Sequence, residues 1–140
     1  MHTDFADIED ALAAAINAQT TVRVSTGYPA GGLRDEEIWI SGTATIDPIT
    51  VVSGHTQRDE RIGFDVNVLA TKSTNDYTAA RDRCLEIVAE IETAIAADLT
   101  LGGLVSVTEI ERIQLDEAIP EDRRRTVGAS VRVACETTVT

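Results

Sequence analysis

The chain has 140 residues, which is enough for one domain with a proper hydrophobic core and too few for two. Hydrophobic residues make up 43% of it, but aromatic residues only 4%, so Ile, Val, Leu and Ala must build the core. The formal net charge of −12 disfavours any function that depends on gripping the phosphates of a nucleic acid.

The sequence shows no membrane-spanning or signal-peptide pattern, and it contains two cysteines. No apolar run approaches the roughly 20 residues of a membrane-spanning helix, and the acidic start MHTDFADIED has no signal-peptide pattern. We therefore expect no association with a membrane. Cys84 and Cys135 fall on the apolar phases of a predicted helix and a predicted strand, which favours buried free thiols and a reducing cytoplasm.

The first third of the chain predicts one helix and two strands. Apolar residues recur at helical spacing over Asp4–Ala18, which predicts a short amphipathic helix. Alternating valines predict a strand at Thr20–Ser25, and the turn-rich segment Gly27–Leu33 follows it without an assignable role. The alternation over Glu36–Ile46 predicts a half-buried strand that Pro48 interrupts.

The middle of the chain predicts a loop, a strand and a long helix. The polar run Ser53–Glu60 indicates an exposed loop, and Arg61–Thr71 shows the clearest strand alternation in the chain. The long amphipathic helix is predicted at approximately Asn75–Ala97, with Thr74 as its N-cap and Asp76 in its first turn.

A double glycine follows the long helix. Gly102 and Gly103 come at the negative end of the helix dipole, so an anion-binding role is disfavoured. We expect left-handed or extended positions there that end the helix and turn the chain back. Leu99 and Leu101 are expected to fold onto the apolar face of the helix.

Two further strands are predicted, at Leu104–Glu117 and Thr126–Val139. In the first of them Ile110 falls out of phase with the other apolar residues. Either local burial of the second face or a pair of bulges near Thr108 and Glu111 would explain this.

These elements predict a single α+β domain over residues 1–140. It would have a mostly antiparallel sheet of about 4–5 strands, paired mainly between sequence neighbours, with one long and one short helix packed on one face. The other face should be polar unless a partner covers it, because it would carry Asp65, Asn67, Ser130, Arg132 and Thr138.

No motif indicates catalysis or metal binding. His2 and His55 are the only histidines, and neither lies in a nucleophile or metal-ligand motif. The acidic runs at residues 35–37 and 116–117 lack the pattern of a calcium loop. We expect no catalytic residues, no metal and no cofactor, and His55 is expected at a surface or interface.

Arg123, Arg124 and Arg125 form the one basic cluster, flanked by Glu121 and Asp122. Two interpretations remain open for it. The cluster is either a charged turn paired with its own acids, or a surface that contacts an acidic patch on a neighbouring copy, head to tail.

Three segments resemble the tail-terminator, or tail-completion, proteins of long-tailed bacteriophages. They are R-D-E-R-I-G-F-D-V-N-V at Arg58–Val68, A-A-R-D-R-C-L-E-I-V at Ala79–Val88 and D-L-T-L-G-G-L-V at Asp98–Val105. The likeness extends from roughly Thr43 to the end of the chain. Its motifs are structural, so they indicate a shared fold and not a shared chemical activity.

The resemblance implies a structural virion protein rather than an enzyme. Such a protein would form a homo-oligomeric ring, typically a hexamer, that caps the tail tube protein and joins the head-tail connector proteins. The virion would be assembled in the host cytoplasm, and genomic DNA would pass through the ring without specific binding. Six copies would carry about −72, six times the charge of one chain, which suits a channel for sliding DNA.

By the same resemblance, the segment from Ser53 to Arg61 contacts the tail tube or the neighbouring subunit. Arg58, Glu60 and Arg61 are its candidates for interfacial ion pairs. The alternatives are a head-to-tail connector or stopper protein of the neck, an acidic DNA-mimic inhibitor and, as the weakest, an enzyme. A DNA mimic would arrange carboxylates in phosphate-like rows.

Overall fold

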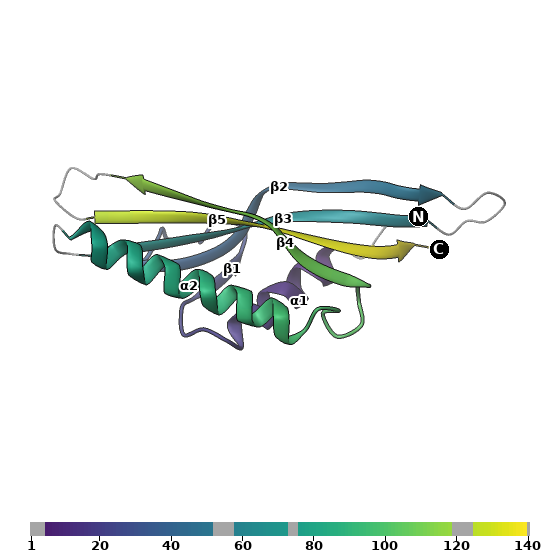
Figure 1. Ribbon diagram of the computed structural model, residues 1–140, viewed down its shortest axis with the longest axis horizontal. Helices are drawn as coiled ribbons and strands as arrows, with labels where there is room; N and C mark the ends of the chain where they lie inside the picture. The colour runs from purple at the N-terminus through teal and green to yellow at the C-terminus, as the bar shows by residue number, and fades with distance from the viewer. Residues whose placement is uncertain (1–4, 52–57, 73–75, 119–124, 140) are drawn as a thin grey trace.

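The computed structural model describes the backbone of residues 5–51, 58–72, 76–118 and 125–139 (Figure 1), and the side chains of these except 41–51, 58–59, 118, 125 and 138–139. These residues form two helices and five strands, which confirms the predicted α+β class. In chain order they are α1 (Phe5–Asn17), β1 (Val24–Thr26), β2 (Glu36–Val51), β3 (Arg58–Lys72), α2 (Tyr77–Ala97), β4 (Val107–Ala118) and β5 (Arg125–Val139).

All five strands belong to one sheet, in the order β1-β2-β3-β5-β4. β1 runs parallel to β2, and the remaining neighbours are antiparallel. Pairing between sequence neighbours was predicted, and it holds for β1 with β2, β2 with β3, and β4 with β5. The central contact between β3 and β5 joins strands that α2 and β4 separate in the sequence, so local periodicity could not reveal it.

Both helices lie on the same side of this long, twisted sheet (Figure 1). The buried face of α1 comes from Ile8, Leu12 and Ile16 at four-residue spacing, and Phe5 contacts Phe64 of β3 at 5.1 Å between ring centroids. Burial of apolar surface between helices and sheet is the main force that holds the layers together. The core residues of β3, α2 and β5 that are at most 1% exposed are Ile62, Phe64, Val66, Val68, Ala70, Ala80, Cys84, Ile87, Ile91, Ala94, Val127, Val131, Val133 and Cys135.

Both cysteines are buried free thiols, as predicted. Burial raises the pKa of the Cys84 thiol to about 11. Burial also raises the pKa of Cys135, and a contact with the Thr108 hydroxyl at 3.6 Å only partly opposes it. Both thiols therefore stay protonated and unreactive at neutral pH.

Helix α2 begins at Tyr77, two residues later than the prediction placed it. Asp76 is the N-cap, and its carboxylate accepts a hydrogen bond from the Ala79 amide at 3.1 Å. Thr74 was predicted as the cap and lies outside the described residues. A carboxylate next to the positive end of the helix dipole is a strong cap, which explains why Asp76 takes this position.

The double glycine turns the chain after α2 as expected, but the helix itself already ends at Ala97, with Asp98 as its C-cap. Gly102 and Gly103 have φ of +70° and +93°, and the Gly102 amide donates to the Asp98 carboxylate at 3.1 Å. Leu101 folds into the core at 3% exposed, as predicted. Leu99 is 47% exposed, so the prediction was wrong for this residue.

Strand β2 continues through Pro48, which was predicted to interrupt it. β1 pairs only with Ile38–Ile40, so the rest of β2 has a single neighbour and forms an edge of the sheet. A proline, which lacks an N–H group, is tolerated on such an edge. Register shifts occur between Ser41 and Thr45 and around this proline. β3 begins at Arg58, so the polar run at residues 53–60 is not all loop.

One bulge explains the phase of β4. The register with β5 shifts between Ile110 and Arg112, so Glu111 is the extra residue. The shift places Ile110 and Ile113 on the same, helix-facing side of the sheet, opposite Val133 and Val131. A pair of bulges was one of the two predicted explanations, but the structure has a single shift. Val107, which was predicted in phase with Ile113, therefore lies opposite Glu136 on the helix-free face.

Candidate interaction surface

The helix-free face of the sheet carries charge, as predicted. Asp65 and Arg132 lie directly opposite each other on β3 and β5 and form an ion pair at 3.2 Å. The neighbouring pair on the same face is Asn67 and Ser130, and all four side chains are half-buried. Thr138, the fifth predicted member of this face, has no described side chain.

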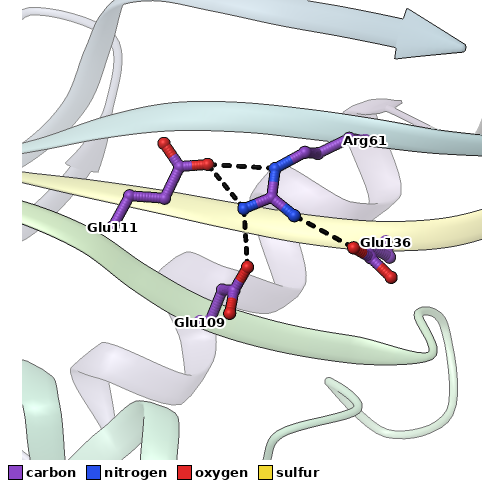
Figure 2. Close-up of polar contacts among 4 residues, drawn as sticks. All are labelled: Arg61, Glu109, Glu111 and Glu136. Atoms are coloured by element: carbon purple, nitrogen blue, oxygen red, sulfur yellow. Dashed lines mark hydrogen bonds and ion pairs between the residues drawn. The ribbon is translucent and has the colours of Figure 1, made fainter. Parts of the chain in front are cut away.

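The same face also carries a cluster of one arginine and three glutamates, here called the Arg61 cluster (Figure 2). Arg61 comes from β3, Glu136 from β5, and Glu109 and Glu111 from β4. The guanidinium donates to Glu111 from two nitrogens at 3.0 and 2.7 Å, to Glu109 at 2.6 Å and to Glu136 at 2.9 Å. Three strands are thereby tied through one side chain.

Strand register and the bulge together build this cluster. Arg61 and Glu136 are directly opposite each other in the ladder between β3 and β5. Glu109 and Glu111 lie two residues apart on β4, so strand alternation directs both toward the same face. The register shift at Glu111 then advances this carboxylate to a second nitrogen of the guanidinium.

The cluster holds more negative than positive charge. The hydrogen bonds that Arg61 donates to Glu111 and Glu109 raise the pKa of Arg61 further above its ordinary value, so this guanidinium is always charged. Against its single positive charge stand three carboxylates whose side chains are between 38% and 52% exposed. The Arg61 cluster is therefore an acidic patch with a net charge of about −2, open to solvent and to a basic partner.

A second cluster, the Glu37 clamp, lies near the β1 edge. The Glu37 carboxylate is fully buried and accepts hydrogen bonds from the guanidinium of Arg23 and, at 3.0 Å, from the Arg34 amide. Burial alone would raise the pKa of Glu37, but these bonds outweigh it and hold the pKa below its ordinary value. The carboxylate is therefore charged at neutral pH.

The Gly27–Leu33 segment forms part of this clamp. Arg23 also donates to the Gly32 carbonyl at 3.2 Å. Tyr28 packs edge-on against Trp39 of β2, with ring centroids 5.8 Å apart. The segment thus covers this end of the helix-free face, a role that the sequence did not assign.

The predicted interface residues are widely separated. His55, Arg123 and Arg124 lie outside the described residues, while Arg58 opens β3 and Arg125 opens β5 at opposite ends of the sheet. These two ends are visible in Figure 1, where β5 starts at the end opposite to the start of β3.

Two of the predicted interface residues, Glu60 and Arg61, are neighbours on β3 but point to opposite faces. Glu60 is 2% exposed on the helix-covered side, which places it away from any surface contact. Arg61 is half-exposed and engaged by the three glutamates of its cluster.

The sequence reasoning missed the partners of both clusters. Alternation alone could have placed Glu109, Glu111 and Glu136 on polar phases of their strands. It could not bring them to Arg61, because that requires β5 between β3 and β4. Within the described ranges no three His, Cys, Asp or Glu residues are grouped as metal ligands, and no helix there is long and apolar enough to cross a membrane.

No protein-family model matches the sequence, and no curated protein matches it. Among solved structures, the chain is similar to one described as "Virion of native gene transfer agent (GTA) particle". The identity is 14% and the TM-score 0.40, and the match covers 89% of this chain and 84% of that chain. A TM-score of this size carries no argument, so function must be argued from this chain's own residues.

Proposed function

We propose that the chain is a structural protein of a long-tailed bacteriophage that forms a ring at the junction of tail and head, as a tail terminator does. The proposal starts from the sequence resemblance. The three segments that carry it form β3, the first half of α2 and the turn after α2, which are the central strand, the covering helix and the exit from that helix. The resemblance therefore involves the framework of the domain.

The ring is supported by the position of the arginine cluster in the sequence, at the start of β5, relative to the acidic Arg61 cluster. Arg123 and Arg124 immediately precede β5, whose first residue, Arg125, lies opposite Lys72. The Arg61 cluster lies toward the other end, where Arg58 pairs with Val139. At ~3.3 Å per strand residue, the two ends of β5 are about 45 Å apart.

A basic end and an acidic patch that are far apart on one subunit suit a head-to-tail contact. Such a contact uses two different surfaces of each copy and closes into a ring when the rotation between copies allows it. Complementary charge would also set the register of the contact and speed the encounter of subunits. The proposal adopts the second of the two interpretations of the arginine cluster.

In this proposal the protein is not an enzyme. Its partners are further copies of itself, six in a complete ring, the tail tube protein on one side and head-tail connector proteins on the other. The acidic surface lets genomic DNA pass through the lumen without binding, because like charges repel. A stopper protein of the neck would use the same ring and would differ in binding to the tail tube.

A DNA-mimic inhibitor fits the geometry less well. A mimic needs carboxylates that stand free in rows, as phosphates do. Glu109, Glu111 and Glu136 instead converge on Arg61, which neutralises part of their charge and fixes their direction (Figure 2).

The first experiment is light scattering of the purified protein at low and moderate salt, followed by negative-stain imaging with and without tail tubes of the same virion. Rings of six, alone or on tube ends, are the expected result, with weaker assembly at higher salt. A variant with Arg123, Arg124 and Arg125 all changed to Glu should lose the rings. Rings that ignore tubes would favour a neck protein, and a chain that stays unassembled even on tubes would overturn the proposal.

A further inference from the structure

Strand β4 is an open edge of the sheet. It is 12 residues long, and among the described strands its one neighbour is β5. Its outer N–H and C=O groups are therefore available to another strand, and natural proteins seldom leave so long an edge unprotected. The opposite edge differs, because β1 is short and Pro48 interrupts the donors of β2 there.

The helix-facing side of this edge is apolar and exposed. Ile113 and Leu115 are 39% and 43% exposed, although they lie opposite Val131 and Ala129, which are buried. The difference arises because α2 packs against β3 and β5 and barely reaches β4. Two large apolar side chains thus stand at the rim of the core without a cover.

The other side of the same stretch carries opposite charges. Arg112 and Asp116 are exposed, with the exposed Gln114 midway between them. Among the described residues, neither charged side chain has an ion-pair partner. All three lie beyond the bulge, where the ladder with β5 is regular.

This five-residue stretch, Arg-Ile-Gln-Leu-Asp, is complementary to itself when read in the opposite direction. We propose that β4 pairs antiparallel with β4 of a second copy, with Gln114 on the two-fold axis. Ile113 would then face Leu115 of the second copy, and Arg112 would face Asp116, each pair formed twice. The two sheets would become one continuous sheet of ten strands.

Neighbouring registers are less favourable. Centring the pair on Arg112 would place two arginines opposite each other. Centring it on Ile113 would leave the same arginine opposite Gln114 and Leu115 opposite the bulged Glu111. Only the register on Gln114 pairs Ile113 with Leu115 and Arg112 with Asp116, while Gln114 faces its own copy.

This contact goes beyond the proposed ring. A two-fold contact uses the same surface on both copies and is complete with two, so it cannot build a ring by itself. It protects an edge that would otherwise template aggregation, and it uses residues 112–116, which lie outside the Arg61 cluster.

A cysteine at the axis gives a direct test. In an antiparallel pair, directly opposite Cα atoms lie about 4.5–5.5 Å apart, within the range of a disulfide. The variant Gln114→Cys should therefore form a covalent dimer under mild oxidation. Glu92→Cys, on an exposed position of α2, is the matched control and should remain largely uncrosslinked. The native cysteines are buried and should not interfere.

A charge swap tests the register. Arg112→Asp and Asp116→Arg should each weaken dimerisation about tenfold, since either change places like charges opposite each other twice. The double variant should restore most of the affinity, because its pairs are reversed but complementary. Arg81→Asp, an exposed change on α2, is the control and should leave the dimer intact. Sedimentation equilibrium would measure all four variants.

Two results would overturn the proposal: no enhanced crosslinking of Gln114→Cys over its control, or a double charge variant no better than the single ones. Crosslinking without charge rescue would mean that β4 pairs in another register or with another strand. The triple glutamate variant at residues 123–125 should lose the ring but keep the Gln114→Cys crosslink. Failure of this contact can therefore be told apart from failure of the ring.

Discussion

Arg23 and Arg61 both bind carboxylates on the helix-free face of the sheet, but their surroundings differ. Arg23 faces Glu37, whose carboxylate is fully buried beneath the Gly27–Leu33 segment. Arg61 holds three carboxylates that all remain exposed to solvent. The comparison indicates that the burial of the carboxylate matters more than the number of hydrogen bonds. A buried pair contributes to the free energy of unfolding, whereas an exposed pair mainly shapes the charge of the surface.

The largest effect is expected from breaking the buried pair. Arg23→Met should lower Tm by about 10 °C, because it leaves a buried carboxylate without its cation. Thermal unfolding followed by circular dichroism measures this loss. The double variant Arg23→Met with Glu37→Leu should recover much of it, since no buried charge then remains. A Tm unchanged by Arg23→Met would mean that the clamp does not need its cation.

The pH dependence of stability should reveal the same pair. The pKa of Glu37 is lowered from its ordinary 4.5, so it contributes stability that is complete above this value and is lost as the pH falls through the lowered pKa. Denaturant unfolding between about pH 5 and pH 3 should therefore show a flatter decline for Glu37→Gln than for the parent chain. Parallel curves would contradict the lowered pKa.

An intermediate case links the two. Arg83 of α2 donates to both oxygens of Glu36 at 2.9 Å, and this carboxylate is one-third exposed. Its hydrogen bonds with Arg83 lower the pKa of Glu36. Arg83→Met should cost about 1 kcal/mol in unfolding free energy, since solvent screens much of the interaction. Arg81→Met, on the same helix with an exposed partner, is the control and should cost less.

The smallest effect on stability is expected at the exposed cluster. Arg61→Met should cost less than about 1 kcal/mol, because Glu109, Glu111 and Glu136 can turn to water. Added salt should raise the Tm of this variant more than that of the parent, since it screens the repulsion among three carboxylates. A loss as large as that of Arg23→Met would contradict the comparison.

The candidate surface could be predicted only in part. Alternation in β3 and β5 correctly placed Asp65 and Arg132 on the helix-free face. Arg61 was named as a candidate for ion pairing on the basis of the resemblance. Its partners lie 48 to 75 positions away in the sequence, so they could be found only once the strand order was known.

The solvent exposure of individual side chains also could not be predicted from the sequence. Ile113 and Leu115 follow a core-like alternation, yet they are exposed because α2 ends its coverage at β5. Glu37 reads as a surface acid, yet it is buried because a loop folds over it. In both cases a segment distant in the sequence decides whether the side chain is buried. The alternation along a strand predicts only which face of the sheet the side chain lies on.

The sequence by itself determined the elements, their polar and apolar faces, the burial of both thiols and the turn after α2 at its double glycine. These follow from local rules of spacing, capping and backbone conformation. Only the tertiary structure decided that β5 lies between β3 and β4, that β2 continues past Pro48 and that β4 remains an open edge. The physical reason is that strand neighbours and helix coverage are contacts between distant segments, which local patterns permit without selecting.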